Sequence, residues 1–392
     1  MSKSCYAFLF LLLLALPRSI QSQQRLATAD VSNSSGYVGD EACRSCHEQE
    51  TNLYFETAHH LTSQMPSKHS VLGKFGTGEK ILRTSNPVLH YEMTASKEGY
   101  FETAVGELSP FQKVTRSERI DIVVGSGRKG QTYLFWRDNE LFELPVSYWT
   151  ELDSWVISPG YRDDAPDFHR GVVPRCLECH AGRFATLPES DYSYDPSSFV
   201  LGITCERCHG PGGKHVHLRR TQTGAIPAPQ DPIVNPASFP RGRQIDICAS
   251  CHSGQGQPLA PPLSFTPGKV LQDYVRIPYQ VDAPIDVHGN QTQLLGRSRC
   301  FHGSTMTCTT CHDVHKRQRD AASFSPHCLT CHKDKDCGKF KELGSAKITS
   351  NCVDCHMPLQ ESNVIVSDTN GRTVKARVRN HNIGIYPEAQ VQ

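Results

Sequence analysis

One pentapeptide, Cys-x-x-Cys-His, constrains this sequence of 392 residues more than any other feature. It occurs seven times and uses fourteen of the seventeen cysteines. Each copy places two thiols and one imidazole within about one helical turn, so the fold must accommodate seven such groups. The copies are Cys43–His47, Cys176–His180, Cys205–His209, Cys248–His252, Cys308–His312, Cys328–His332 and Cys352–His356.

The spacing inside each copy is typical of covalent haem attachment. Residues three apart on a helical turn face the same side, so both thiols can add to the vinyl groups along one haem edge. The next residue, histidine, then supplies the proximal nitrogen of the iron. We therefore expect seven covalently bound haem c groups. The expected thioether cysteines are Cys43, Cys46, Cys176, Cys179, Cys205, Cys208, Cys248, Cys251, Cys308, Cys311, Cys328, Cys331, Cys352 and Cys355. The expected proximal histidines are His47, His180, His209, His252, His312, His332 and His356.

Two other chemistries also use Cys-x-x-Cys pairs. Paired units can form four-cysteine zinc sites, but zinc does not need a histidine directly after every second cysteine. All seven copies have that histidine. A thioredoxin-like dithiol would occur once, in a βαβ setting. Haem attachment therefore explains the pattern better than either alternative.

The remaining histidines are candidates for the sixth position of each iron. The chain has nineteen histidines, of which seven are proximal and twelve remain, whereas it has only five methionines. Met357 directly follows His356 and is badly placed for the opposite face of the same ring. We expect mainly bis-histidine haems, whose reduction potentials are lower than those of methionine–histidine haems. The candidate distal ligands are His59, His90, His169, His215, His288, His315 and His381.

The segment CERCHGPGGKHVH, residues 205–217, indicates how distal ligands are shared. His215 follows its motif histidine by six residues, so it begins on the proximal side with the macrocycle in the way. The turn formed by Gly210, Pro211 and two further glycines would direct His215 or His217 to a neighbouring ring. His315, three residues after His312, has the same geometry. We expect such histidines to bind neighbouring haems, and solvent-exposed side chains are the alternative.

The N-terminal 22 residues are typical of a secretory signal peptide. Lys3 precedes an apolar run from Tyr6 to Leu16. As a helix this run would rise about 16 Å, too little for a hydrocarbon core of about 30 Å. An uncleaved anchor is the alternative. The sequence predicts an exported chain, periplasmic or beyond, with no membrane span after cleavage. A net charge of +1 gives no reason to expect a nucleic acid partner.

The distribution of cysteines suggests four segments. They are the signal peptide 1–22, an N-terminal haem segment 23–70 with one motif, a β-rich module 71–165 with none, and a multihaem domain 166–392 with six. Alternating stretches such as GYFETAV predict strands in the module, with a hairpin turn at Asp138-Asn139. GSGRKG, residues 125–130, matches a dinucleotide-binding pattern. A strand-like sequence follows it where that fold needs a helix, so we expect a hairpin loop.

The six motifs after residue 175 are separated by short intervals rich in glycine and proline. We expect short helices at the motifs, joined by irregular loops, with the haems filling the core. The fold class is therefore α+β with little regular secondary structure: short α-helices organised around covalent haems, plus a small antiparallel β module.

The segment GYVGDEACRSCHEQETNLYFETAHH, residues 36–60, resembles the first haem segment of the cytochrome c-552/4 (c-554-like) family. That resemblance implies that His59 is an axial ligand, with His60 as the alternative. Segments within 171–385, such as NCVDCHMP, are similar to larger multihaem relatives. The positions that match distal ligands there are His215, His288 and His315. His381 resembles their closing histidine, although Asn380 replaces the aspartate that often precedes it.

Cys300 and Cys337 lie outside the motifs, in segments that also resemble those relatives. In an exported protein a disulfide between them is expected, and free buried thiols are the alternative.

Two functions are compatible with these features. The first is an exported heptahaem cytochrome that transfers electrons between redox partner proteins such as a quinol dehydrogenase or other cytochromes. The second is a multihaem oxidoreductase in which one haem keeps an open site for hydroxylamine or a small nitrogen or sulfur oxyanion. The resemblance implies periplasmic electron transfer, and some relatives act on such oxyanions. The surplus of histidines favours the first function, and the sequence identifies no catalytic residue.

Overall fold

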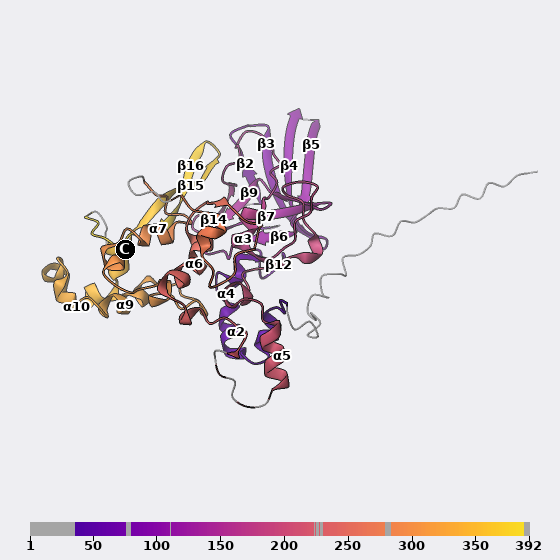
Figure 1. Cartoon of the computed structure of the whole chain (residues 1–392). Helices are drawn as coiled ribbons and strands as arrows, with labels where there is room; N and C mark the ends of the chain where they lie inside the picture. The colour runs from indigo at the N-terminus through magenta and orange to yellow at the C-terminus, as the bar shows by residue number, and fades with distance from the viewer. Residues whose placement is uncertain are drawn as a thin grey trace, which may run out of the picture.

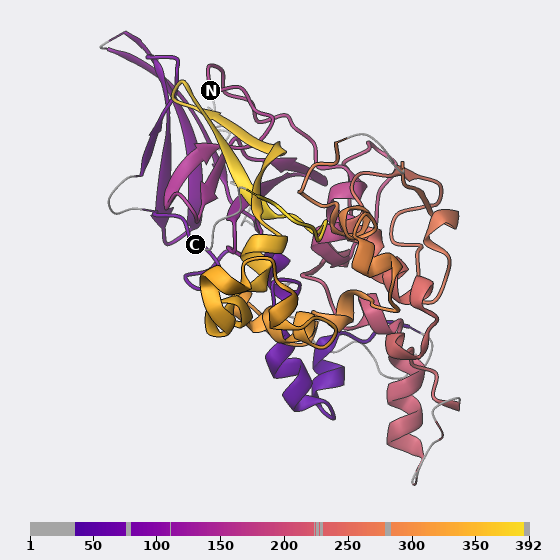
Figure 2. The same cartoon turned by 90° about the vertical axis from the view of Figure 1, so that its left-hand side faces the viewer.

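The structure, a computed structural model, describes residues 36–387 except 76–79, 110, 223, 225–226, 228–229 and 279–283. The predicted signal peptide lies outside these residues. Strands gather on one side of the molecule and short helices on the other, as two perpendicular views show (Figures 1 and 2). The α+β class is therefore confirmed.

The first sheet has four antiparallel strands in the order β2-β3-β4-β5. Its strand β3 reads LHYEMTAS, and Leu89, Tyr91 and Met93 are buried while the residues between them are partly exposed. This period of two places one face of the sheet against a core and the other toward solvent. The strands are β2 (Ile81–Arg83), β3 (Leu89–Ser96), β4 (Gly99–Ser109) and β5 (Gln112–Arg119).

The second sheet has the order β1-β6-β7-β9-β10, and β8 also pairs with β7. Arg137 pairs with Glu140, so Asp138-Asn139 is a two-residue hairpin turn, and Asp138 has a φ of 54°. The hairpin turn predicted there is confirmed. The strands are β1 (Ser63–Gln64), β6 (Ile122–Val124), β7 (Gly130–Arg137), β8 (Glu140–Glu143), β9 (Val146–Trp149) and β10 (Ser154–Ile157). We call the two sheets together the β module.

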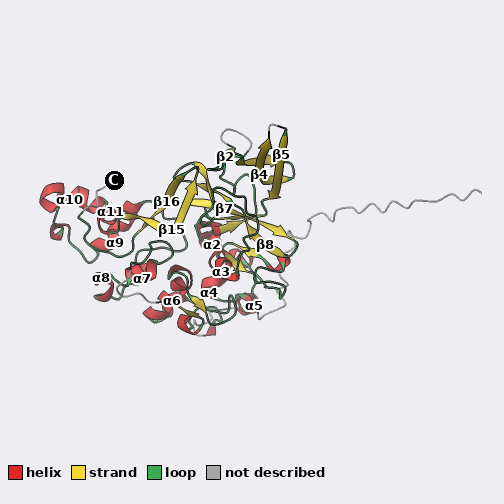
Figure 3. Ribbon diagram, turned by 90° about the horizontal axis from the view of Figure 1, so that it is seen from above, coloured by secondary structure: helices red, strands yellow, loops and turns green. Residues whose placement is uncertain are grey.

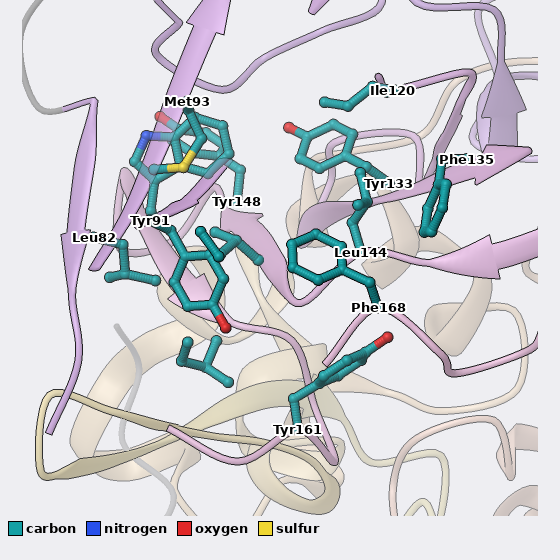
Figure 4. Close-up of a cluster of buried hydrophobic side chains, with 14 of the residues drawn as sticks. Leu82, Tyr91, Met93, Ile120, Tyr133, Phe135, Leu144, Tyr148, Tyr161 and Phe168 are labelled. Atoms are coloured by element: carbon teal, nitrogen blue, oxygen red, sulfur yellow. The ribbon is translucent and has the colours of Figure 1, made fainter. Parts of the chain in front are cut away.

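The segment GSGRKG connects β6 to β7, which pair antiparallel. The predicted hairpin loop is thus confirmed, and the absence of a helix after it removes the basis for a dinucleotide site. A cluster of buried aromatic and aliphatic side chains fills the β module, with Tyr91, Tyr133 and Phe135 almost fully buried (Figure 4).

A long C-terminal hairpin is the main feature that the sequence analysis did not anticipate. It consists of β15 (Leu359–Thr369) and β16 (Arg372–Arg379) and lies beside the β module (Figure 2). Ala376 packs with Trp149 and Val156, and the Ile157 amide donates to Thr369 Oγ1 at 2.9 Å. Strands β15 and β16 therefore pack, as a separate hairpin, against a module whose strands lie between residues 63 and 157.

The helices are short, and none that the structure describes is long and apolar enough to cross a membrane. Figure 3 shows the helices in red, with α5, α6 and α8 along one side of the molecule. Two further small sheets accompany the helices. The α-helices are α1 (Asp40–Arg44), α2 (Glu48–Tyr54), α3 (Pro174–His180), α4 (Glu206–His209), α5 (Gly213–Thr221), α6 (Arg241–His252), α7 (Gln291–Leu295), α8 (Arg299–His302), α9 (Ser325–Leu329), α10 (Phe340–Ser350) and α11 (Cys352–His356). The small sheets pair β11 (Ala181–Arg183) with β12 (Val200–Leu201), and β13 (Gln257–Pro258) with β14 (Val275–Arg276).

Several 3-10 turns connect these elements. They are His60–Thr62, Pro196–Ser198, Pro236–Ser238, Leu271–Asp273, Cys308–Thr310, Ala321–Phe324 and Asp334–Asp336.

Buried apolar side chains are unevenly distributed. Most of them belong to the β module and to the segment just after it. Among the described residues after Ile203, the buried apolar side chains are Val216, Ala249, Leu271, Val275, Val287, Leu294, Val353 and Ala376. Side-chain packing alone therefore provides little core for the part of the chain that carries five of the seven motifs.

Candidate functional site

Each Cys-x-x-Cys-His motif forms a helical turn or ends one. In the first motif the amides of Cys46 and His47 both donate to the carbonyl of Cys43, at 3.1 and 2.9 Å. The same pair of bonds recurs in the motifs that begin at Cys205, Cys308 and Cys328. A bond from the fourth residue back to the first holds the two thiols on one side of the turn, as attachment to one haem edge requires.

Thiols of different motifs lie next to each other. The four pairs are Cys43–Cys205, Cys179–Cys251, Cys248–Cys308 and Cys328–Cys352. In the first three pairs, the hydrogen bond between the two thiols is the main cause that raises the pKa of one partner, namely Cys205, Cys179 and Cys248. In the fourth pair, burial and then the charge of Cys352 raise the pKa of Cys328. Each pair brings two motifs side by side.

Variable residues inside the motifs hold these neighbours together. Glu206 is buried, and its carboxylate accepts hydrogen bonds from the amides of Val38, Gly39 and Gly212 at 2.8–2.9 Å. The first motif is therefore anchored to the third. In the same way, the Arg207 guanidinium donates to the carbonyl of Glu178 in the second motif, at 3.0 Å.

Four histidines from outside the motifs face motif histidines from other segments. His215 lies beside His47, with ring centroids 6.4 Å apart, and not beside His209 of its own motif. His315 likewise lies beside His209 and not beside His312, at 6.0 Å. The other two pairs are His59 with His252 at 6.1 Å and His381 with His312 at 6.3 Å. The chain thus brings together imidazoles that are far apart in sequence.

The Nδ1 atoms of several of these rings have defined partners. Nδ1 of His209 lies 2.8 Å from the carbonyl oxygen of Val234, and Nδ1 of His356 lies 2.8 Å from that of Gly384. A carbonyl oxygen can only accept, so Nδ1 donates and Nε2 keeps a free lone pair. The other Nδ1 contacts are His180 to Thr62 Oγ1 (2.9 Å), His252 to Gln291 Oε1 (3.1 Å), His381 to the Arg379 carbonyl (3.1 Å) and His215 to Asp231 Oδ1 (2.6 Å).

The protein environment favours the neutral form of six histidines in and around the motifs. Surrounding protein, followed by the nearby rings of His252 and His312, lowers the pKa of His59 to about 4, although part of the residue remains accessible to solvent. Burial also lowers the pKa of His381 to about 4. The pKa values of four more histidines are lowered, with burial as the main cause; they are His180, His209, His288 and His312. A neutral imidazole is the form that binds a metal.

Three of the candidate distal histidines have no ring partner of this kind in the described part of the chain. His90 lies on β3, with Nε2 3.2 Å from Glu92. The side chain of His169 is 68% exposed, with Nδ1 3.5 Å from Asp167. His288 lies near His180, since its charge lowers the pKa of that histidine. His90 and His169 thus contact carboxylates of nearby residues, and, among the residues that the structure describes, neither lies beside a motif histidine.

Cys300 and Cys337 are both free thiols in the structure, and a disulfide between them stays a prediction. Burial is the main cause of the raised pKa values of Cys311 and Cys328, and Cys300 lies close enough to both thiols to add to this effect. Cys337 instead lies near Cys355. The two thiols belong to the surroundings of different motifs.

The Nδ1 partners are the functional residues that sequence reasoning missed. Val234, Gly384 and Arg379 contribute backbone carbonyls, which carry no side-chain signal. Asp231 and Gln291 lie 16 and 39 residues from their histidines, so no local pattern connects them. Among the described residues, no three histidine, cysteine, aspartate or glutamate side chains form a cluster that could hold a metal ion by themselves.

Comparisons with known proteins point to multihaem cytochromes. A family model described as cytochrome c554 and c-prime matches residues 161–210, which contain the second and third motifs. The fold is similar to that of the outer cell wall cytochrome OcwA, with a TM-score of 0.54 and 18% identity over 88% of this chain and 79% of that chain. An undecahaem cytochrome from the S-layer of Carboxydothermus ferrireducens aligns with a TM-score of 0.44 and 15% identity, covering 90% of this chain and 52% of that one. No curated protein sequence matches this chain.

Proposed function

We propose that this chain is an exported c-type cytochrome that carries seven covalent haems and transfers electrons through them, with histidine on both sides of most irons. The residues of the chain attach each haem through two thioethers and hold the axial imidazoles in place. When bound, haem c supplies a one-electron iron couple.

The spacing of the four histidine pairs carries this proposal. Two imidazoles that bind one iron from opposite sides, each at about 2 Å through Nε2, have ring centroids about 6 Å apart. The observed separations are 6.0–6.4 Å. The angles between the ring planes range from 23° to 75°, which axial ligation permits because each ring can rotate about the axis through the metal.

The hydrogen bonds at Nδ1 support the same assignment. Metal-binding histidines usually donate their outer N–H to a carbonyl or carboxylate, which fixes the ring and its tautomer. His209, His356 and His381 have carbonyl partners, and His215 has a carboxylate. Each bond leaves Nε2 available on the side away from its partner.

Electron transfer between haems is supported by the proximity of the motifs. The thiol contacts bring the first motif next to the third, the fourth next to both the second and the fifth, and the sixth next to the seventh. Close spacing of redox groups is what conduction along a chain requires. Under this proposal His288 is the candidate partner of His180.

The proposal also covers export and the redox partners of the chain. The similar structures come from an outer cell wall cytochrome and an S-layer cytochrome. A chain with a cleaved N-terminal segment and the same kind of fold would exchange electrons with other cytochromes or with a quinol dehydrogenase outside the cytoplasm.

Expression with and without the haem-attachment machinery tests the proposal. We expect the mature chain to retain seven haems, measured by mass, after acid–acetone extraction. Replacing Cys308 and Cys311 with serine should remove one haem, whereas Cys300→Ser, outside the motifs, should remove none. The oxidised protein should give mainly low-spin haem signals in electron paramagnetic resonance. A mass equal to that of the bare polypeptide contradicts the proposal.

A further inference from the structure

His215 differs from the other candidate ligands in what holds its outer nitrogen. Its Nδ1 lies 2.6 Å from Asp231 Oδ1, and the side chain of Asp231 is only 7% exposed. The amide of Ile233 also donates to this oxygen, at 3.3 Å. The contact is therefore a hydrogen bond between an imidazole and a carboxylate whose side chain is largely covered by protein.

Arg219 fixes the other oxygen of the same carboxylate. It lies four residues after His215 on α5, so both side chains project from one face of the helix. Its Nε donates to Asp231 Oδ2 at 3.0 Å, and its Nη2 donates to the same oxygen. Asp231 is thus held from both sides, by an imidazole on Oδ1 and by a guanidinium on Oδ2.

Five other paired or motif histidines have described Nδ1 partners, and all five partners are uncharged. His209, His356 and His381 bond to backbone carbonyls, whereas His252 bonds to the amide oxygen of Gln291. His180 contacts a hydroxyl. Of the six Nδ1 hydrogen bonds described for the paired and motif histidines, only that of His215 is made to a carboxylate.

A carboxylate acceptor changes the ligand more than a carbonyl does. It draws the Nδ1 proton toward itself, so Nε2 becomes a stronger electron donor. A stronger donor stabilises the ferric over the ferrous state, which lowers the reduction potential. Arg219 limits this effect, because its positive charge withdraws electron density from the same carboxylate.

We infer that Asp231 is a positioning residue that fixes the ring of His215 and lowers the reduction potential of the iron between His47 and His215. The inference rests on the proposed function, because it takes His215 as an axial ligand. It adds a specific effect: the reduction potential at this site is lower than it would be with a neutral Nδ1 acceptor.

Redox titration of the full haem-loaded chain tests the inference with two variants of opposite sign. Asp231→Asn keeps an oxygen at Oδ1 but removes the charge. One couple should move up by about 59 mV or more, a tenfold shift of a one-electron equilibrium. Arg219→Gln leaves the carboxylate without its cation, so the same couple should move down. Asp231→Glu keeps the negative charge, so the potential of this couple should lie closer to the wild-type value than it does in Asp231→Asn.

Arg220→Gln is the matched control, because Arg220 is an exposed neighbour on α5 and loses the same charge. No couple should move in this variant by as much as in Arg219→Gln. Asp231→Asn should also change the g values of one low-spin haem. A loss of packing alone would shift the reduction potential in the same direction in Asp231→Asn and in Arg219→Gln.

The outcomes separate this inference from the proposed function. If the peptide with Cys43 and Cys46 lacks haem in the wild-type chain, the proposed function fails. If that peptide carries haem and no couple moves in Asp231→Asn, only the present inference is overturned. Shifts of equal sign in Asp231→Asn and Arg219→Gln also overturn it.

Discussion

Glu102 lies inside the β module with no exposed surface, and neither of its carboxylate oxygens has a hydrogen-bond partner. Burial raises its pKa well above the usual value for glutamate, whereas the backbone of Val146 opposes the shift without forming a well-aligned hydrogen bond. The hydroxyls of Tyr91 and Tyr133 are also unpaired. An ionised carboxylate would be costly here, so the folded chain keeps the proton on Glu102.

This proton predicts how stability depends on pH. A glutamate in the unfolded chain loses its proton near pH 4.3, at about the reference value. The folded state keeps it at higher pH, so folding becomes less favourable as the pH rises from there toward the raised pKa. We expect Glu102→Gln to remove much of this loss and to stabilise the chain by about 1–3 kcal/mol at pH 8. Urea unfolding at pH 5 and pH 8, followed by circular dichroism, measures the effect.

Glu98→Gln is the control for this prediction, because Glu98 is exposed in the turn between β3 and β4. It should change stability equally little at both pH values. An unchanged pH dependence in Glu102→Gln would show that Glu102 is ionised in the folded chain.

At the scale of elements, the C-terminal hairpin shows a local signal that is easy to overlook. Thr369 pairs with Arg372, so Asn370-Gly371 forms a two-residue turn, with φ values of 50° and 69°. Asn-Gly suits a type I′ turn because both central residues need a positive φ. The strands then extend to the β module, where Arg377 forms an ion pair with Glu151 at 2.7 Å.

A glycine exchange at this turn tests its contribution. Gly371→Ala should destabilise the chain by about 1–2 kcal/mol, because a Cβ disfavours the left-handed conformation. The loss comes from the local backbone alone, since no atom outside the adjacent residues lies within 4 Å of the added Cβ. Gly242→Ala, on helix α6, also meets no atom and should stabilise the chain by about 0.4–1 kcal/mol. Equal effects in both variants, measured by urea unfolding, would contradict this account.

At the scale of the whole molecule, two parts are stabilised differently. The β module has a continuous core of buried aromatic and aliphatic side chains (Figure 4). The motif-bearing part has few buried apolar residues and is held by polar anchors such as Glu206 and Arg207. Under the proposed function, the haems supply the missing apolar volume there.

This difference predicts the behaviour of the chain without haem. When the chain is produced without the attachment machinery, strands β3, β4 and β7 should stay protected from hydrogen exchange, whereas α4, α6 and α11 should exchange at nearly unprotected rates. With haem attached, both parts should be protected. Equal protection of the motif helices in the two forms would mean that side chains alone stabilise that part.

The sequence by itself determined the chemistry of attachment and the presence of local elements. The Cys-x-x-Cys-His spacing acts within one helical turn, and the turn at Asp138-Asn139 depends on neighbouring residues, so both can be read without the fold. The α+β class followed from the same local patterns. The sequence also indicated that His215 and His315 belong to other motifs than their own, because the chain cannot reach around its own ring.

Only the tertiary structure decided which histidine faces which motif and what holds each ring. His381 and His312 are 69 residues apart, and His59 and His252 are 193 apart, so their meeting depends on the packing of all the segments between them. Asp231, Val234 and Gly384 likewise reach their histidines only through the fold. Local sequence specifies groups that lie within a turn of each other, whereas contacts between distant segments arise from the collective free energy of packing, which no short pattern contains.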